Sequence, residues 1–501
     1  MNNTANLRTY FNITFGNNKK RKHCIIVIIL FLGSLIFACR LPNTEMSLNA
    51  KGTLDSIRII KQPDKKNYKM GEELITADLV VENVYTNEST KITDNYYLSG
   101  DTFTSGSICI TVISKLDASK TDTFNINVSD ELINTGLPVI YIETENAAPI
   151  VSKEDWVSTK VKVVSDNPEY SFEKTDYQDQ IRGRGNTSWW YPKKPYRIRF
   201  RENTSMFGLT AARNWVLLAN YKVATLMADT VAFELGQRFD GPLFKNHYVY
   251  VDVVLNGQYN GIYILTEHMR VDPGRVEIDK RNGYLVELDV YYDEDPKFTT
   301  RNLNLPVMIT SPDFGANIED PGYKFVKDSL NEYDTLLSDV KFPNNGWQDK
   351  IDIDSFVDYL LINEIVFNNE LNHPKSVYMC KDVGGKIRMS HLWDFDWAFG
   401  LGWAVTVDVS TARTRFDGGK FKQFHKDLNF KAKYKARWNE KYSQINSMSE
   451  FINITAQKIK ISHSLDNRRW HEGAINFEEE VNKLKTWWSN RISYLNSKIN
   501  N

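Results

Sequence analysis

The chain has 501 residues, of which 42% are hydrophobic and 25% are charged. These fractions match soluble globular proteins and exclude a disordered, collagen-like or polytopic membrane protein. The 62 Lys and Arg residues nearly balance the 63 Asp and Glu residues, which gives a formal net charge of −1. Because the chain has no overall basic field, no nucleic-acid partner is expected. All 12 Trp residues lie at or after Trp156, so the first third of the chain differs chemically from the rest.

The N-terminus has the pattern of an export signal. A basic cluster at 19–22 precedes an uncharged apolar run at 24–38, which is shorter than the ~20 residues that a membrane-spanning helix needs. The residues Ile-Phe-Ala-Cys (36–39) resemble a bacterial lipobox. We therefore expect a lipoprotein signal peptide over 1–38, acylation of Cys39, and anchoring in the bacterial cell envelope (outer membrane, periplasmic or surface-exposed). The alternative is a short anchor helix with an incidental Cys.

Short strands separated by turn residues are predicted over 54–128. The segments 56–60, 79–84, 109–113 and 123–128 have strand patterns, and no long amphipathic helix lies between them, which is typical of a β-sandwich. The residues Lys-Asn-Tyr-Lys-Met-Gly-Glu-Glu-Leu (66–74) and Leu-Ser-Gly (98–100) resemble immunoglobulin-like modules of bacterial surface proteins. Such modules mostly act as spacers or adhesive units. We expect the module over 39–129 and a linker over 130–136.

The first motif with chemical content is a glycine turn, Arg-Gly-Arg-Gly-Asn-Thr-Ser-Trp (182–189). Its glycines permit a tight turn whose N–H groups approach a phosphate. Lys193, Lys194, Arg197 and Arg199 follow, and backbone donors beside fixed positive charge suit a nucleotide triphosphate. The motif is neither G-x-G-x-x-G nor a Walker A sequence. A β-hairpin with a solvated basic face is the alternative.

A helix and a hairpin are predicted further along the chain. The apolar pattern over 354–367 predicts a helix with Asp354 as its N-cap. Strands are predicted at 376–380 and 386–390, joined by the turn Asp-Val-Gly-Gly. Because a hairpin begins and ends at the same end of the sheet, the loops before and after it are expected to meet.

Acidic residues occupy both of those loops. Glu370 precedes the hairpin, and Asp394 and Asp396 follow it, which is the layout by which protein kinases bring a catalytic-loop base close to metal-binding carboxylates. The two aspartates supply carboxylates for Mg²⁺, and Asn372 adds an amide oxygen. In the alternative interpretation the aspartates, which alternate with aromatic residues, are capping or salt-bridged acids, and Glu370 is a solvated loop residue.

Seven blocks of sequence, in order, are similar to the spore coat protein H (CotH) kinase family. They lie at 137–142, 182–189, 193–200, 214–221, 261–267, 283–289 and 393–400. The resemblance implies a CotH kinase-like domain over 137–500. The expected fold class is therefore α+β, with a two-lobed atypical protein-kinase-like domain preceded by the small all-β immunoglobulin-like sandwich.

The resemblance also implies roles for individual residues. Asp394 and Asp396 hold the metal, and Asp394 is therefore part of the catalytic machinery. Glu370 takes the position of the presumed base, where the family often has an Asp, and is one methylene longer. The residues implied near the nucleotide are Arg184, Gly185, Asn186, Lys194 and Glu287 (or Asp289).

The expected function is that of a secreted or surface lipoprotein whose kinase domain transfers the γ-phosphoryl group of ATP to a protein hydroxyl. Mg²⁺ or Mn²⁺ is the implied cofactor, and a secreted or surface protein is the implied acceptor. The alternative is a non-catalytic surface lipoprotein that binds a polysaccharide or a protein partner through the same cleft. Five tryptophans suit sugar stacking: Trp189, Trp190, Trp393, Trp397 and Trp403. The helical pattern over 451–500 is expected to complete the large lobe.

Overall fold

The computed structural model describes residues 52–239, 244–315, 317–372, 374–400, 410 and 420–501. The predicted signal peptide and Cys39 lie outside these residues. None of the helices that the structure describes combines the length and the apolar character needed to span a bilayer. Of the cysteines in the described residues, Cys109 is exposed and Cys380 is buried, and both are free thiols.

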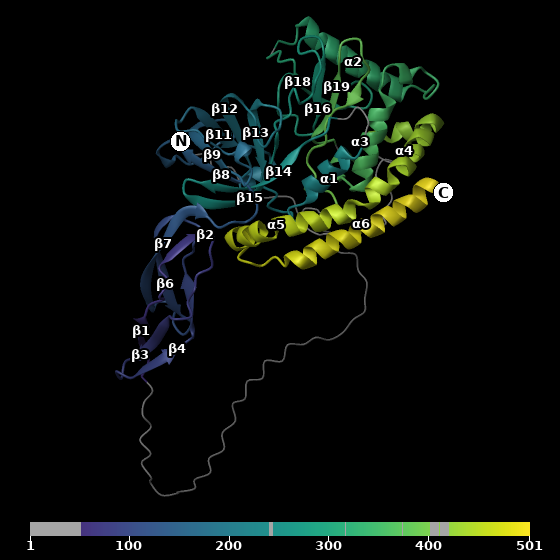
Figure 1. Cartoon of the computed structure of the whole chain (residues 1–501). Coiled ribbons are helices and arrows are strands. Elements are labelled where there is room, and N and C mark those ends of the chain that lie inside the picture. Colours follow the sequence, from purple (N-terminus) through teal and green to yellow (C-terminus); the bar gives the residue numbers. More distant parts are fainter. Residues whose placement is uncertain (1–51, 240–243, 316, 373, 401–409, 411–419) are drawn as a thin grey trace, which may run out of the picture. The chain divides into compact units, whose positions relative to one another are not determined.

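The first described part of the chain is a unit of two β-sheets, here called the two-sheet unit (Figure 1). One sheet has the order β1 (Leu54–Lys61), β3 (Val80–Tyr85), β4 (Thr90–Thr93), and the other has the order β2 (Asn67–Met70), β7 (Thr121–Leu132), β6 (Gly106–Ser114), β5 (Tyr96–Ser99). Apolar side chains from both sheets share one core, in which Ile57 and Val81 of the first sheet join Ile110 and Phe124 of the second.

The four strands predicted from the sequence overlap β1, β3, β6 and β7. The linker predicted at 130–136 overlaps the end of β7, which continues to Leu132. Ser129, Asp130 and Glu131 are exposed in succession, and Leu132 is buried in the core of the unit.

The next part of the chain is an eight-stranded sheet that closes on itself. β8 (Val139–Thr144) pairs in parallel with β14 (Tyr248–Leu255) and antiparallel with β9 (Val157–Val164). The strand ring therefore runs through β9, β11 (Asp179–Gly183), β12 (Tyr196–Thr204), β13 (Ala212–Leu218), β15 (Gln258–Glu267), β14 and β8, and β10 (Phe172–Glu173) is added to β9. Alternate side chains such as Ile181, Ile198 and Trp215 fill its interior, as in other small closed sheets.

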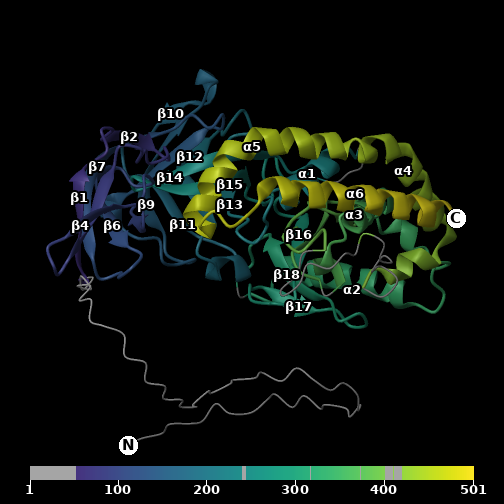
Figure 2. The same ribbon diagram turned by 90° about the horizontal axis from the view of Figure 1, so that it is seen from below.

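The remaining part is rich in helices and is called the helix-rich region. Its five-stranded sheet has the order β17 (Lys297–Thr299), β18 (Pro306–Ser311), β16 (Tyr284–Leu288), β19 (Val377–Lys381), β20 (Arg388–Met389). The helices are α1 (Ala228–Gln237), α2 (Pro321–Ser338), α3 (Ile353–Ile365), α4 (Leu428–Asn446), α5 (Met448–His471) and α6 (Phe477–Asn500). One core cluster includes residues of the sheet and of all these helices. α5 and α6 lie side by side (Figure 1 and Figure 2).

Short 3₁₀ helices connect these elements: η1 (Glu145–Ala147), η2 (Pro168–Tyr170), η3 (Thr187–Trp190), η4 (Trp347–Asp349), η5 (Asn369–Asn372) and η7 (Lys422–Lys426). η3 lies between the glycine turn and Lys194, and η5 contains Glu370 and Asn372.

The predicted helix at 354–367 is α3, but its N-cap is Asp352 and not Asp354. The Asp352 side chain accepts a hydrogen bond from the Ser355 N–H (3.2 Å), whereas Asp354 lies inside the helix and pairs with Lys433 (3.1 Å). The predicted hairpin is β19 with β20, which pair antiparallel. The helices predicted at the C-terminus belong to the core of the helix-rich region.

Candidate functional site

One cavity of about 240 Å³ is lined both by the strand ring and its loops and by the helix-rich region. The sequence-predicted residues that line it are Arg184, Gly185, Asn186, Glu287, Glu370, Asp394 and Asp396. Asp289, the stated alternative to Glu287, lines it as well. Lys194 does not. The Asn372 side chain lies outside the described part of the structure, so its role stays a prediction.

The glycine turn directs Arg184 to the cavity. Gly183 ends β11, and a Cβ at this position would collide with the Trp189 ring, while Gly185 has a positive φ of 82° and a Cβ there would collide with Ser188 Oγ. Both positions therefore require glycine. The Arg184 guanidinium lies 5.4 Å from the ring centroid of Trp393. Burial lowers the pKa of Arg184, and the neighbouring carboxylates oppose this.

The buried cation of the cavity is Lys193, the neighbour of the predicted Lys194. Lys193 Nζ is fully buried, lies 2.6 Å from Asp466 Oδ1 of α5 and donates a hydrogen bond to Ile262 O (2.6 Å). Lys194 Nζ instead donates to Trp189 O (2.7 Å). Burial lowers the pKa of Lys193, and the charge of Asp466 and its hydrogen bond oppose this.

Three further carboxyl groups line the same cavity, those of Asp229, Asp394 and Asp396. Asp394 has a φ of 63°, a left-handed conformation that is uncommon for a residue other than glycine and that clusters at functional sites. Its side chain is hydrogen-bonded to that of Asp396. The next backbone N–H along, that of Phe395, donates to Asp229 Oδ1 of α1 (3.0 Å). The loop after β20 therefore carries the carboxyls of Asp394 and Asp396 and is bonded through its backbone to the carboxyl of Asp229.

The electrostatics of this group favour a bound cation. Burial, with repulsion from Asp394, raises the pKa of Asp229 to about 6. Burial and the repulsion of its neighbours raise the pKa of Asp396 well above its usual range, and burial also raises that of Asp394. Carboxyls whose pKa is raised by burial and by like-charged neighbours regain their ionised form when a cation binds beside them.

Glu370 lies in η5 with only 4% of its surface exposed. Its Oε2 atom lies 3.7 Å from Lys375 Nζ and, among the described residues, has no hydrogen-bond partner. Burial and repulsion from Asp394 raise the pKa of Glu370 to about 7. A carboxyl that exchanges its proton near neutral pH is suited to general base chemistry.

Glu287 is the residue that β16 of the five-stranded sheet contributes to the cavity. It lies on β16 directly across from Tyr378 of β19, whose hydroxyl donates a hydrogen bond to it. Burial, with repulsion from acidic neighbours such as Asp289, raises the pKa of Glu287 to about 8. This side chain is therefore largely protonated at pH 7 and presents a hydrogen-bond donor as well as an acceptor.

The carboxylates of the cavity fit a divalent metal that takes some of its ligands from the protein and the others from a substrate. In the described part of the chain, no group of three or more His, Cys, Asp or Glu side chains is arranged to hold a metal ion by itself. Mg²⁺, however, usually takes one or two protein carboxylates and completes its coordination with water and phosphate oxygens. Asp394 and Asp396 supply two carboxylates in contact with each other. Glu370, whose Oε2 atom has no hydrogen-bond partner among the described residues, lines the same cavity.

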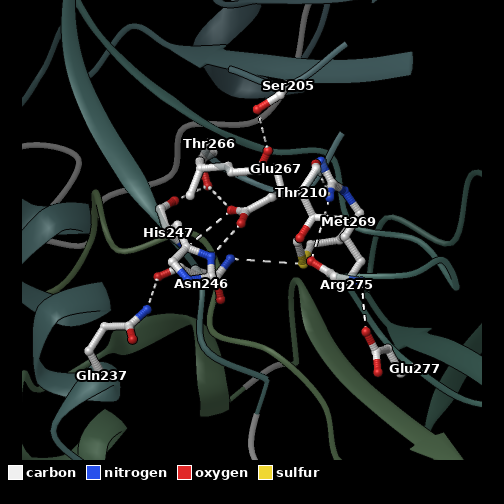
Figure 3. A network of polar contacts seen from close by, with 12 residues as sticks. Ser205, Thr210, Gln237, Asn246, His247, Thr266, Glu267, Met269, Arg275 and Glu277 are labelled. Carbon is white, nitrogen blue, oxygen red and sulfur yellow. Dashed lines mark hydrogen bonds and ion pairs between the residues drawn. The ribbon is translucent and has the colours of Figure 1, made fainter. Parts of the chain in front are cut away.

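A polar network surrounds Asn246, His247 and Glu267 (Figure 3). Glu267, buried at the end of β15, accepts a hydrogen bond from the His247 N–H (3.1 Å) and contacts His247 Nδ1 at 2.6 Å, and this bond raises the pKa of His247. The adjacent Asn246 accepts at its backbone oxygen from Gln237 of α1 (2.6 Å) and at Oδ1 from the Leu392 N–H (3.2 Å). The network thus ties the loop after β20 to α1 and β14.

The aromatic residues of the cavity serve as platforms for its cations. Trp393 and Trp397 line it, with Arg184 over the first ring at 5.4 Å and Lys375 over the second at 5.1 Å. The two tryptophans of η3 do not line it, and Trp403 lies outside the described residues. This arrangement uses the two rings to support positive charge, which does not favour the sugar-stacking alternative.

Three residues of the site were not singled out from the sequence: Asp229, Lys375 and Asp466. Lys193 was named among the cations after the glycine turn, but Lys194 was chosen as the one near the nucleotide. Asp229 carried a signal, since it stands alone as a charged residue in the apolar segment 223–233. Lys375 was part of the loop that contains Glu370. No local signal connects Lys193 with Asp466, which lie far apart in the chain.

The cavity combines a glycine turn that carries an arginine, a buried lysine and several carboxylates. Phosphotransferases place groups of this kind around a phosphate chain. The comparison with protein families agrees. The family model described as CotH kinase protein matches residues 181–495, which include every residue that lines the cavity. The chain therefore belongs to the CotH kinase family, and this membership indicates a kinase-like function. None of the curated proteins compared with the chain matches it significantly.

Proposed function

We propose that the chain is an ATP-dependent phosphotransferase that transfers the γ-phosphoryl group to a hydroxyl of a secreted or surface protein, with Mg²⁺ or Mn²⁺. The observation that carries the proposal is that Arg184, Lys193, Glu370, Asp394 and Asp396 line one cavity. Its volume of about 240 Å³ is below the ~300–1,000 Å³ of typical small-molecule sites. We therefore assign to it the phosphate chain and the acceptor hydroxyl, and not the whole nucleotide.

Each group has a chemical task in this proposal. Arg184 and Lys193 offset the negative charge of the phosphate oxygens, and the backbone N–H groups of the glycine turn add donors. Asp394 and Asp396 hold the metal, which when bound supplies further neutralising charge. Glu370 accepts the proton of the acceptor hydroxyl as the new O–P bond forms. The bond between the γ-phosphorus and its bridging oxygen breaks, and ADP leaves.

The test of the proposal is the variant Glu370→Gln, assayed with labelled ATP and an acceptor protein. Because only the ionised carboxylate accepts a proton, the wild-type transfer rate is expected to rise with pH through about 7. The amide accepts no proton, so transfer is expected to fall by about 100-fold or more and to lose this rise, while ATP–Mg²⁺ still binds.

The matched control is Glu169→Gln, an exposed glutamate on η2, which is expected to behave as the wild type. Wild-type rates and an unchanged pH profile in Glu370→Gln would remove Glu370 from the mechanism. A wild-type protein that binds no ATP–Mg²⁺ would overturn the proposed function itself.

We further propose that the two-sheet unit is an immunoglobulin-like module and that the protein is anchored in the bacterial cell envelope by a lipid on Cys39. The support is the apolar run and the Ile-Phe-Ala-Cys sequence at 36–39. Cys39→Ala is expected to move the protein from the membrane fraction to the soluble fraction of lysed cells. Continued association of this variant with membranes would contradict the lipid anchor.

A further inference from the structure

The end of α5 that carries Asp466 is also the place where the two-sheet unit contacts the rest of the chain. We propose that the two-sheet unit is a positioning element: it braces α5, and through α5 it holds Asp466 against Lys193. The inference rests on the proposed function in one respect, namely that Lys193 meets the phosphate groups of ATP. It assigns the unit a task beyond that of a spacer.

The contact with α5 is both apolar and polar. Leu465 of α5 belongs to the hydrophobic core of the two-sheet unit and packs against Gly71, where an added Cβ would lie 3.3 Å from its Cδ1 atom. One turn on, Arg468 donates a hydrogen bond to Gly71 O (2.7 Å), and its guanidinium lies 5.2 Å from the ring centroid of Phe103. The last turns of α5 are therefore packed by the unit.

The same unit also holds the start of β15. The backbone N–H of Ser105 donates to Gly257 O (2.9 Å), and the Tyr259 N–H donates to Phe103 O (2.7 Å). The Tyr259 side chain is part of the unit's core. Phe103 thus contacts both α5 and β15, the two elements between which the buried ion pair lies.

Asp466 and β15 together enclose the ammonium group of Lys193. Asp466 Oδ1 lies 2.6 Å from Lys193 Nζ and accepts a hydrogen bond from the Ile262 N–H (3.0 Å). Ile262 O in turn accepts a hydrogen bond from Lys193 Nζ (2.6 Å). The geometry of this group depends on the distance between α5 and β15.

A second set of buried hydrogen bonds links the same two elements. Asp252 of β14 accepts from Ser462 of α5 (2.8 Å), from Tyr259 of β15 (2.8 Å) and from Thr135 (2.6 Å), a residue between the two-sheet unit and the strand ring. Leu465 and Arg468 flank Asp466 along the helix, so a rotation of α5 that releases the unit also moves the Asp466 carboxylate away from Lys193.

The experiment uses Arg468→Ala in the full chain and measures ATP–Mg²⁺ affinity. The loss of the Gly71 bond and of the Phe103 contact is expected to weaken affinity about 5-fold or more. Arg468→Lys, which keeps a donor for Gly71 O, is expected to recover part of it. Lys460→Ala is the matched control, since this residue of α5 is exposed and pairs only with the exposed Glu478 among the described residues.

A double-mutant cycle shows whether Arg468 acts through Asp466. In the background Asp466→Asn, the further change Arg468→Ala is expected to have no additional effect on affinity. The same 5-fold loss in both backgrounds, or wild-type affinity in Arg468→Ala, would overturn the proposal, because Arg468 would then be a separate contact or no contributor.

Amide exchange separates this proposal from the proposed function, since it requires no nucleotide. Arg468→Ala is expected to accelerate exchange at the Ile262 N–H, which is bonded to Asp466, and to leave exchange at the Val216 N–H of β13 unchanged. Unaltered Ile262 exchange would overturn the bracing of α5 even if ATP binds. Accelerated Ile262 exchange in a protein that binds no ATP would support the bracing and refute only the kinase activity.

Discussion

Asp394→Asn is expected to lower phosphoryl transfer by about 100-fold or more without lowering the thermal stability of the metal-free protein. The substitution removes one of the charges proposed to hold the metal and keeps the size of the side chain. Asn tolerates the left-handed backbone conformation found here, with φ of 63°, whereas Ala at this position adds backbone strain. Asn removes repulsion from Asp396 and Asp229 together with attraction to Arg184, so the two effects offset and the unfolding temperature is expected to stay equal.

The measurement is thermal unfolding with and without ATP–Mg²⁺, together with the transfer assay. The wild type is expected to be stabilised by ATP–Mg²⁺ because the ligand binds the folded state, and Asp394→Asn is expected to lose most of this stabilisation. Asp313→Asn, a change at an exposed loop aspartate, serves as the control. Transfer that survives in Asp394→Asn would contradict the metal role of this carboxylate.

Lys193→Met is expected to destabilise the fold by about 3–5 kcal/mol, because it leaves the Asp466 carboxylate buried without its cation. Both side chains are almost completely inaccessible to solvent, so water does not replace the lost partner. The free energy of unfolding is measured by urea denaturation. ATP–Mg²⁺ binding is expected to disappear as well, since one of the two cations proposed to offset the phosphate charge is lost.

A double variant separates these two effects. Lys193→Met with Asp466→Asn removes both charges, and the Asn side-chain oxygen still accepts the hydrogen bond of the Ile262 N–H. Most of the lost stability is therefore expected to return, while ATP–Mg²⁺ binding stays absent. A double variant that is stable and binds ATP–Mg²⁺ like the wild type would show that the ion pair has only a structural role.

The parts of the site that lie close together in the chain were predictable. Glu370, Asp394 and Asp396 flank one hairpin, and a hairpin brings its two flanking loops together irrespective of the rest of the fold. The glycine turn was likewise a local pattern, and it does bring Arg184 to the cavity. For these residues, the neighbours expected from the sequence pattern are also neighbours in the tertiary structure.

The parts that depend on distant neighbours were not predictable. Lys193 and Lys194 are adjacent in an irregular segment with no periodicity, so nothing in the sequence selects the one that meets Asp466 on α5. Asp352 and Asp354 both fit the pattern of an N-cap, and helix ends are uncertain by one or two residues. The closure of the strand ring depends on β8 pairing with both β9 and β14, which no single segment encodes.

The closed ring has a consequence for the rigidity of the cavity. An open sheet can slide or fan out when a ligand binds, but hydrogen bonds around the whole circumference of the ring oppose such shear. The loop between β11 and β12, which carries Arg184 and Lys193, begins and ends on two paired strands of this ring. This side of the cavity is therefore expected to be stiff, so that its cations keep their positions when the cavity is filled or emptied.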